Sequence, residues 1–325
     1  MINKQNLLSY FNLALAQSAI AINVLAGKYL LDKSMPIWLF IGGRFFCSSV
    51  MLILATLLVK QPLQIEPKQG KVGFKMWTLL FLQALTGGFL FNVLFMEGIV
   101  YTTATDASII GSTLPALIAI SAFFFLGEKF TKTTIAALIL AMVGILIINL
   151  DNLQPLEPSN GSLWGNFLVF LAMVPEALYS IVSKFVGRKI NALAGAMVVN
   201  CLCFLMFLPL MLYALQGQDL TQYLPFDWFL IFAGGASTAI FYWCWSLGLI
   251  TIPASIAALF SGFTPIATSL GAFFWLDEKF GLYDAVGLLL VILSIVIGAR
   301  TGKSFLGSVF RFRFAKTISE VSSTE

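Results

Sequence analysis

Residues 111–130 read GSTLPALIAISAFFFLGEKF and residues 261–280 read SGFTPIATSLGAFFWLDEKF, so one stretch of sequence occurs twice. The match extends without a gap from Gly98–Ile147 to Gly248–Ile297. Each copy has a proline inside an apolar run and a Glu-Lys-Phe after it. A repeat of this length indicates a duplicated structural unit.

The composition of the chain predicts a membrane protein. Hydrophobic residues make up 59% of the 325 and charged residues only 10%, and the mean hydropathy is +0.93. A soluble domain has about 25% charged residues. Because this chain cannot build a water-exposed surface, we expect it to lie in lipid.

Several classes of site are excluded or disfavoured by the residues present. The chain has no histidine, which excludes Ser-His-Asp and Cys-His catalysis and histidine ligation of zinc or haem. The sequence has no Walker-type phosphate loop, so we expect no ATP-driven step within it. The cysteines form no CxxC pair and lie in apolar runs at Cys47, Cys201, Cys203 and Cys244. We therefore predict no enzyme, metal or cofactor.

Ten apolar runs are long enough to cross a hydrocarbon core of about 30 Å as helices. The first run is longer than the apolar region of a signal peptide and has no clear cleavage site, so we expect a retained span. The predicted fold is an all-α integral membrane protein with ten transmembrane helices. Their expected limits are 10–30, 37–59, 76–96, 104–126, 133–149, 163–184, 193–215, 228–249, 254–276 and 283–299.

Positive charge predicts the orientation. The N-terminus, the even-numbered loops and the tail contain fifteen Lys and Arg residues, whereas the odd-numbered loops and their flanks contain three. The positive-inside rule then places both termini in the cytoplasm. Because each half has five helices, the second half (151–300) must be inverted relative to the first (1–150). A basic cytoplasmic tail, 301–325, follows.

Several short motifs in both halves together carry a resemblance to a known family. They are Lys28, Pro36, Arg44, Thr102-x-Ala104, Pro115, Leu126-Gly127-Glu128, Gly144, Ala254-Ser255, Pro265, Leu276-Asp277-Glu278 and Gly287. With these motifs the chain resembles, from about residue 8 to residue 300, the EamA-type members of the drug/metabolite transporter superfamily. The resemblance implies a central cavity lined by spans one, three, four, six, eight and nine, with spans five and ten outside. It also implies transport, since such proteins commonly export amino acids or other metabolites and some import nutrients.

Glu176 departs from the family pattern, as does Glu97, because such positions more often hold small or apolar residues. Glu176 follows Pro175 near the middle of the sixth run. An ionised carboxylate there costs on the order of 3 kcal/mol, so we expect it to face a cavity or a partner. It is a candidate proton-coupling or cation-binding group, with Tyr179 and Ser183 on the same helix face. The alternative is a protonated acid hydrogen-bonded to a neighbouring helix.

Pro115 and Pro265 occupy matched positions inside spans four and nine. Each removes an amide donor and frees the carbonyl four residues earlier, at Gly111 and Ser261. We predict gating hinges here, with Gly111 and Gly262 as the flexible residues. An inert kink in a closely packed helix is the alternative.

The remaining polar residues within the spans are candidate substrate contacts. Amides and aromatic rings that converge on a cavity suit ammonium and carboxylate groups. Interhelical hydrogen bonding is the alternative for Asn92 and Gln17, and ordinary packing is the alternative for Trp245. The candidates are Gln17, Asn23, Asn92, Ser112, Tyr242, Trp245 and Ser261.

Three charged residues toward the outer side form a candidate charge network. Arg44 lies about 10 Å below the predicted outer surface and is expected to pair with Glu97 or Asp106 or to snorkel, rather than to bind substrate. Lys184, at the end of span six, is expected to be a snorkelling anchor.

The sequence thus predicts a secondary transporter for an amino acid, amine or drug-like compound, with proton-coupled export across the inner (cytoplasmic) membrane. Import or exchange by the same fold stays open, and a non-transporting receptor or assembly partner is the alternative of another class. The expected partners are the substrate, protons and the lipid bilayer, with no nucleic acid. Spans five and ten offer a surface for a homodimer.

Overall fold

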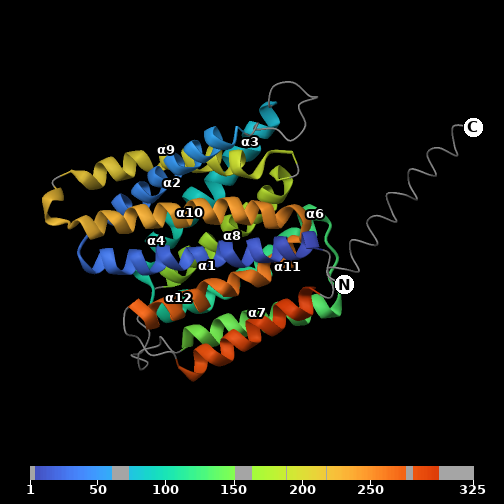
Figure 1. Cartoon of the computed structure of the whole chain (residues 1–325). Coiled ribbons are helices and arrows are strands. Elements are labelled where there is room, and N and C mark those ends of the chain that lie inside the picture. The colour runs from blue at the N-terminus through green and yellow to red at the C-terminus, as the bar shows by residue number, and fades with distance from the viewer. Residues whose placement is uncertain are drawn as a thin grey trace, which may run out of the picture.

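The structure, a computed structural model, is nearly all helical over the residues it describes (Figure 1). Nine helices in these ranges are long and apolar enough to span a membrane, and a tenth apolar helix, Lys132–Ile148, is shorter. The predicted all-α membrane fold is confirmed. The described ranges are 4–60, 73–150, 163–187, 189–216, 218–275 and 281–299.

The first half contains two uninterrupted spans, two interrupted ones and a short one. The third span changes from α-helix to π-helix and back, and the fourth is broken at Ser112–Thr113. The elements are α1 (Lys4–Asp32), α2 (Ile37–Val59), α3 (Phe74–Gln83), a π-helical segment (Ala84–Leu90), α4 (Phe91–Tyr101), α5 (Ala104–Gly111), α6 (Leu114–Leu126) and α7 (Lys132–Leu150).

The second half follows the same order, and its fourth span is also interrupted. The interruption is a 3-10 segment that ends directly before α12. The elements are α8 (Leu163–Val186), α9 (Ala192–Leu215), a 3-10 turn (Leu220–Gln222), α10 (Pro225–Thr251), α11 (Ala254–Ala257), a 3-10 segment (Ala258–Gly262), α12 (Phe263–Trp275) and a final helix (Leu282–Ala299).

Local sequence explains where the helices begin and end. The Asn191 side chain accepts hydrogen bonds from the amides of Leu193 (3.0 Å) and Ala194 (3.4 Å), so it caps the start of α9. Gly127 has a φ of 67° at the end of α6, in the left-handed region that glycine adopts without steric cost.

Six spans form two groups of three with matching arrangements. In the first group, α1 packs along α10 and α12; in the second, α8 packs along α4 and α6. The 150-residue repeat relates spans three and four of the second group to spans eight and nine of the first. Span two packs along span seven, where the two halves meet.

Glycines allow the closest helix contacts, and some of these contacts recur in both halves. A β-carbon on Gly98 would lie 2.7 Å from Val169 of α8, and one on Gly248 would lie 2.5 Å from Leu13 of α1. Gly98 and Gly248 are 150 positions apart in the repeat. A glycine at the matched position therefore allows span three to pack closely on span six and span eight to pack closely on span one.

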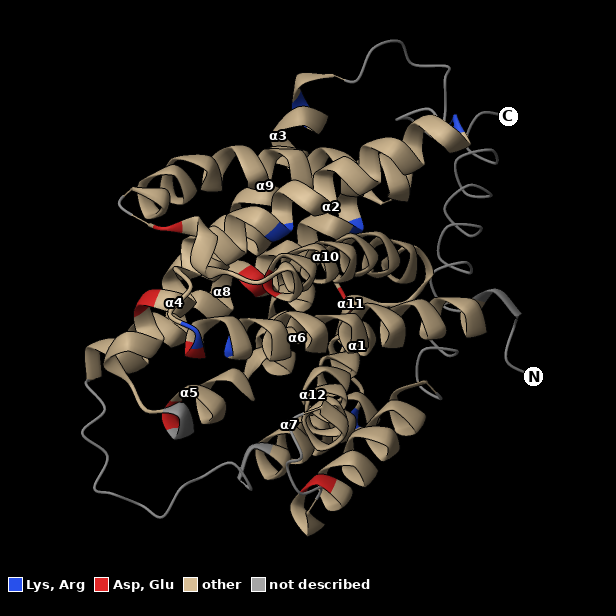
Figure 2. Ribbon diagram, turned by 60° about the vertical axis from the view of Figure 1, so that its left-hand side comes forward, with Lys and Arg blue, Asp and Glu red and all other residues tan. Residues whose placement is uncertain are grey.

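The outer surface is apolar, as lipid requires. Most of the ribbon in Figure 2 carries no Lys, Arg, Asp or Glu. The α7 helix and the final helix lie side by side at one edge of the bundle (Figure 1), where a β-carbon on Gly287 would meet the Gly144 carbonyl at 2.6 Å. Spans five and ten therefore lie outside the two groups, as the resemblance implies.

Candidate functional site

A π-helical segment in span three lies at the centre of the candidate site. Its two glycines provide room for neighbouring side chains, because a β-carbon on Gly87 would lie 2.3 Å from the Tyr179 ring. One on Gly88 would lie 2.1 Å from the Cys203 sulfur. Single π-helical turns are frequent at functional sites. Spans three, six and seven therefore meet here with almost no separation.

An aromatic cluster surrounds this point. Tyr179 is fully buried, and its ring lies 5.5 Å from the Tyr242 ring in an edge-to-face arrangement. Phe241 stacks on Tyr179 at 6.2 Å and on Trp245 at 6.0 Å, and Phe45 reaches Tyr242 from span two at 6.2 Å. The structure thus brings three of the predicted site residues together: Tyr179, Tyr242 and Trp245.

Two buried polar atoms of this cluster have no hydrogen-bond partner within the described ranges: the Tyr179 hydroxyl and the Trp245 indole nitrogen. Buried polar groups normally find a partner, so these are groups that a ligand or water can satisfy.

Glu176 lies one helical turn before Tyr179, on the same face of α8. It is half-buried, and its carboxylate forms no hydrogen bond with any residue that the structure describes. Further along this face, Ser183 accepts a hydrogen bond from the Gln83 amide of span three at 3.0 Å. Glu176, Tyr179 and Ser183 therefore follow one face of α8, and a coupling role for the carboxylate stays a prediction.

Arg44 has a different partner from the predicted ones. Its guanidinium donates to the Asn92 side-chain oxygen at 2.6 Å, and the Asn92 amide donates to the Gly88 carbonyl of the π-helical segment at 2.6 Å. The Arg44 Nε atom is buried and has no partner in the described ranges. The predicted pairing with Glu97 or Asp106 is wrong, because the Arg44 guanidinium bonds to Asn92 instead.

The two acids lie elsewhere. Asp106 accepts a hydrogen bond from the Asn166 side chain at 3.1 Å, and Thr102 donates to the oxygen of the same Asn166 side chain. Glu97 is exposed near the C-terminal end of span three. Asp106 therefore joins spans four and six of one group and takes no part in the central site.

Gln17 and Asn23 connect helices of the first group. Thr264 donates to the Gln17 side-chain oxygen at 2.8 Å, and Asn23 donates to Ser237 (3.1 Å) and Thr238 (3.2 Å). For Gln17 this is the interhelical alternative. The Asn23 side-chain oxygen is buried without a partner in the described ranges.

Both proline positions coincide with interruptions of their helices. Pro115 lies in the first turn of α6, just after the break at Ser112–Thr113, and Pro265 lies in the first turn of α12, just after the 3-10 segment. The breaks flank Gly111 and Gly262, the predicted flexible residues. Their serines bond locally: Ser112 donates to the Ile109 carbonyl (2.6 Å) and Ser261 to the Ala258 carbonyl (2.8 Å).

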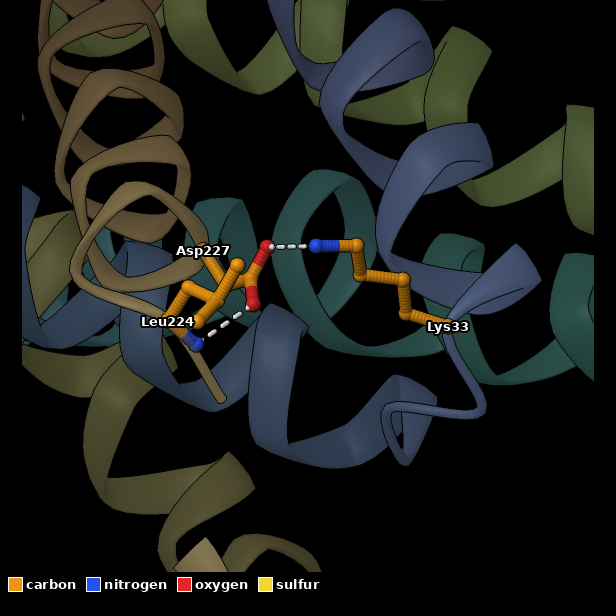
Figure 3. Close-up of polar contacts among 3 residues, drawn as sticks. All are labelled: Lys33, Leu224 and Asp227. Carbon is orange, nitrogen blue, oxygen red and sulfur yellow. Dashed lines mark hydrogen bonds and ion pairs between the residues drawn. The ribbon is translucent and has the colours of Figure 1, made fainter. Parts of the chain in front are cut away.

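An ion pair joins spans one and eight at the end where span one finishes (Figure 3). The Lys33 ammonium lies 3.0 Å from Asp227, and the same carboxylate accepts a hydrogen bond from the Leu224 amide at 2.8 Å. Lys33 also lies 4.8 Å from the centre of the Tyr29 ring. The Tyr29 phenol and the Asp227 carboxylate raise the pKa of the Lys33 ammonium.

Sequence reasoning missed the π-helical segment, the central position of Arg44 and the role of Lys184. Lys184 is buried and donates to the carbonyls of Leu249 (3.2 Å) and Ile252, so it is not a snorkelling anchor. The adjacent glycines at 87 and 88 were the available signal for the central site, since such a pair permits close approach of other helices.

A comparison with known protein families is consistent with this arrangement. A family model described as the EamA-like transporter family matches residues 7–150 and 163–299. This chain belongs to the EamA-like transporter family. It is a multi-pass membrane transporter, and its curated relatives are named as transporters rather than enzymes.

Relatives of this EamA-family chain occur in bacteria and plants. It is 29% identical over 295 residues to the uncharacterized transporter YetK of Bacillus subtilis (strain 168), a match that covers 90% of this chain and 87% of the relative. It is 24% identical over 267 residues to the WAT1-related protein At3g02690, chloroplastic, of Arabidopsis thaliana, covering 79% and 63%. A solved crystal structure shares the fold at a TM-score of 0.71 with 15% identity, covering 93% of this chain and 98% of the other.

Proposed function

We propose that this EamA-family protein is a secondary active transporter that moves a small polar metabolite by alternating access. Its direction is proton-coupled export across the cytoplasmic (inner) membrane, and its substrate is an amino acid, an amine or a drug-like compound. The observation that carries this proposal is Glu176, a half-buried carboxylate in mid-span that has no hydrogen-bond partner in the described ranges.

The surroundings of Glu176 support a polar substrate. Its neighbour Tyr179 contacts Tyr242, whose ring faces suit a bound ammonium group. Arg44 supplies a cation next to the aromatic cluster, with its guanidinium carbon 5.3 Å from the centre of the Phe45 ring. A carboxylate, stacked rings and a guanidinium together fit a cationic or zwitterionic molecule.

The symmetry of the helices supports alternating access. Spans one, eight and nine pack as spans six, three and four do, and the breaks near Pro115 and Pro265 recur at matched positions. We infer that residues 1–150 and 151–300 form inverted repeats, with both termini in the cytoplasm and the breaks as hinges.

Flux measurements test the coupling role. In proteoliposomes with an imposed pH gradient, the wild-type protein is expected to move a member of a broad metabolite panel, and Glu176→Gln is expected to abolish or uncouple that flux. The amide cannot exchange a proton, so the pH dependence should be lost while the protein remains folded.

The matched control is Asp219→Asn, which removes a carboxylate from the exposed segment between spans seven and eight. This variant should retain the flux and its pH dependence. An unchanged pH profile in Glu176→Gln would rule out the coupling role. No flux for any metabolite, together with a co-purifying partner protein, would favour a receptor or assembly role instead.

A further inference from the structure

Glu128 connects span four to the start of span nine. Its carboxylate is 4% exposed and accepts three hydrogen bonds: from the Ala254 amide (2.7 Å), the Ser255 amide (3.0 Å) and the Ser255 hydroxyl (2.6 Å). Both carboxylate oxygens are used. A carboxylate held by the first amides of a helix also interacts favourably with the helix dipole.

Lys184 contacts the same connection between spans eight and nine. This connection, residues 249–255, is where α10 ends and α11 begins, and we call it the elbow. The buried Lys184 ammonium, from the end of α8, donates to the carbonyls of Leu249 and Ile252. A cation at the last carbonyls of a helix is again the favourable sign for the dipole. The elbow is thus held by an acid on its amides and a base on its carbonyls.

These contacts cross between the two groups of spans. Glu128 and Lys184 belong to spans four and six of the second group, whereas the elbow belongs to spans eight and nine of the first. Other interhelical hydrogen bonds near the span ends, within the described ranges, stay inside one group. They include Thr251 to Ser9 (2.7 Å), Lys33 to Asp227 (3.0 Å), Asn166 to Asp106 (3.1 Å) and Thr102 to Asn166.

We propose that Glu128 and Lys184 form a clamp on this elbow that keeps one end of the transporter closed. Under the predicted orientation, that end is cytoplasmic. Releasing the clamp separates the two groups there and opens the path to the cytoplasm. The proposal rests on the alternating-access function above and adds the residues that hold one of its states.

The chemistry of the clamp suits a reversible contact. A buried charge that loses its partners is strongly unfavourable, so the closed form is well defined while the hydrogen bonds last. Both charges lie at the end of a span, where water can hydrate them once the groups separate. Water then replaces the lost hydrogen bonds and removes much of the cost of a buried, unpaired charge, so the open form is also accessible.

Distances between spin labels test the clamp directly. In a variant without the native cysteines, labels at Leu8 (span one) and Lys189 (after span six) report the clamped end, and labels at Asp32 and Leu163 report the opposite end. All four positions are exposed. Glu128→Gln and Lys184→Met are each expected to shift the Leu8–Lys189 distances to longer values.

Two further variants separate the clamp from a general loss of stability. Ser255→Ala removes one hydroxyl donor and should cause a smaller shift in the same direction. Asp284→Asn is the matched control: Asp284 is also a buried carboxylate that accepts from a backbone amide (Gly281, 2.9 Å), but that bond is local to the final helix. It should leave the Leu8–Lys189 distances unchanged.

Unchanged Leu8–Lys189 distances in folded Glu128→Gln, Lys184→Met and Ser255→Ala would overturn the clamp, as would an equal shift in Asp284→Asn. The distances do not depend on transport. If the wild-type protein showed no flux while the clamp variants still opened, the proposed function would fail and the clamp would stand. Flux with unchanged distances would overturn the clamp and leave the proposed function standing.

Discussion

Arg44 joins two spans and keeps one buried donor unused. Its bond to Asn92 ties span two to the π-helical segment of span three, and its Nε atom remains without a partner in the described ranges. An arginine that used all its donors within the protein would only hold helices together. This one retains a buried N–H donor, and under the proposed function a carboxylate or carbonyl of the substrate would accept a hydrogen bond from it.

Lys33 gives a prediction about pH. Contacts with the Tyr29 phenol and the Asp227 carboxylate raise the pKa of this ammonium, so its pKa is higher in the folded than in the unfolded protein. The stabilisation is therefore fully present below the unfolded pKa of about 10.4 and is lost as the pH rises through the raised folded pKa. The melting temperature of Lys33→Met should be below that of the wild type at pH 8, and the difference should shrink above pH 10.4.

The control for this measurement is Lys75→Met, at an exposed lysine near the start of span three. Its melting temperature should follow the wild type across the same pH range. A wild-type advantage over Lys33→Met that persisted unchanged well above the lysine pKa would contradict the assigned role of the Lys33–Asp227 pair.

At the scale of elements, the contact between spans three and six depends on Gly98. A β-carbon there would lie 2.7 Å from the Val169 side chain and 2.9 Å from its backbone nitrogen, and the backbone cannot move aside easily. Gly98→Val should therefore destabilise the protein by about 1–3 kcal/mol, the usual cost of overpacking. Thermal unfolding of the detergent-solubilised protein measures this.

Gly73→Ala is the comparison, since a β-carbon there meets nothing within 4 Å and the backbone has an ordinary φ of −67°. Gly248→Val, at the matched position in the other half, should behave like Gly98→Val because it would press on Leu13. Equal stability of Gly98→Val and the wild type would mean that spans three and six are not packed as described.

The sequence was sufficient for most elements and for part of the site. Hydrophobic run length predicted the ten helices with small errors at their ends, and the prolines predicted both interruptions. It could not predict the π-helical segment, because its residues are as apolar as those of an α-helix. Burial of Lys184 was also missed, since its carbonyl partners at the end of α10 lie far away in the sequence.

The partners of Arg44 show the same limit. The sequence showed how deep Arg44 lies along span two. Its hydrogen-bond partner, among Glu97, Asp106 and Asn92, depends on how the helices are turned relative to one another. In the structure Asn92 is held by the Gly88 carbonyl one turn earlier, and the Arg44 guanidinium bonds to the Asn92 side-chain oxygen. Contacts between helices are fixed by packing, and one sequence alone does not specify the packing.

At the scale of the whole molecule, the duplicated halves make two similar groups of spans that meet around a polar centre. The described contacts between these groups include aromatic rings in the middle, Tyr179 and Tyr242, and two charged side chains that bond to the elbow at one end, Glu128 and Lys184. A molecule joined this way can separate at one end while its centre stays in contact, as alternating access requires.

The inverted relation of the two halves is the central claim, and labelling of single cysteines tests it most directly. Lys129 and Lys279 follow the same glutamate in the two copies of the repeat. In a variant without the native cysteines, a membrane-impermeant thiol reagent applied to intact cells should label position 279 and leave position 129 unlabelled. Inverted vesicles should give the opposite result. Labelling of both positions from the same side would contradict the account.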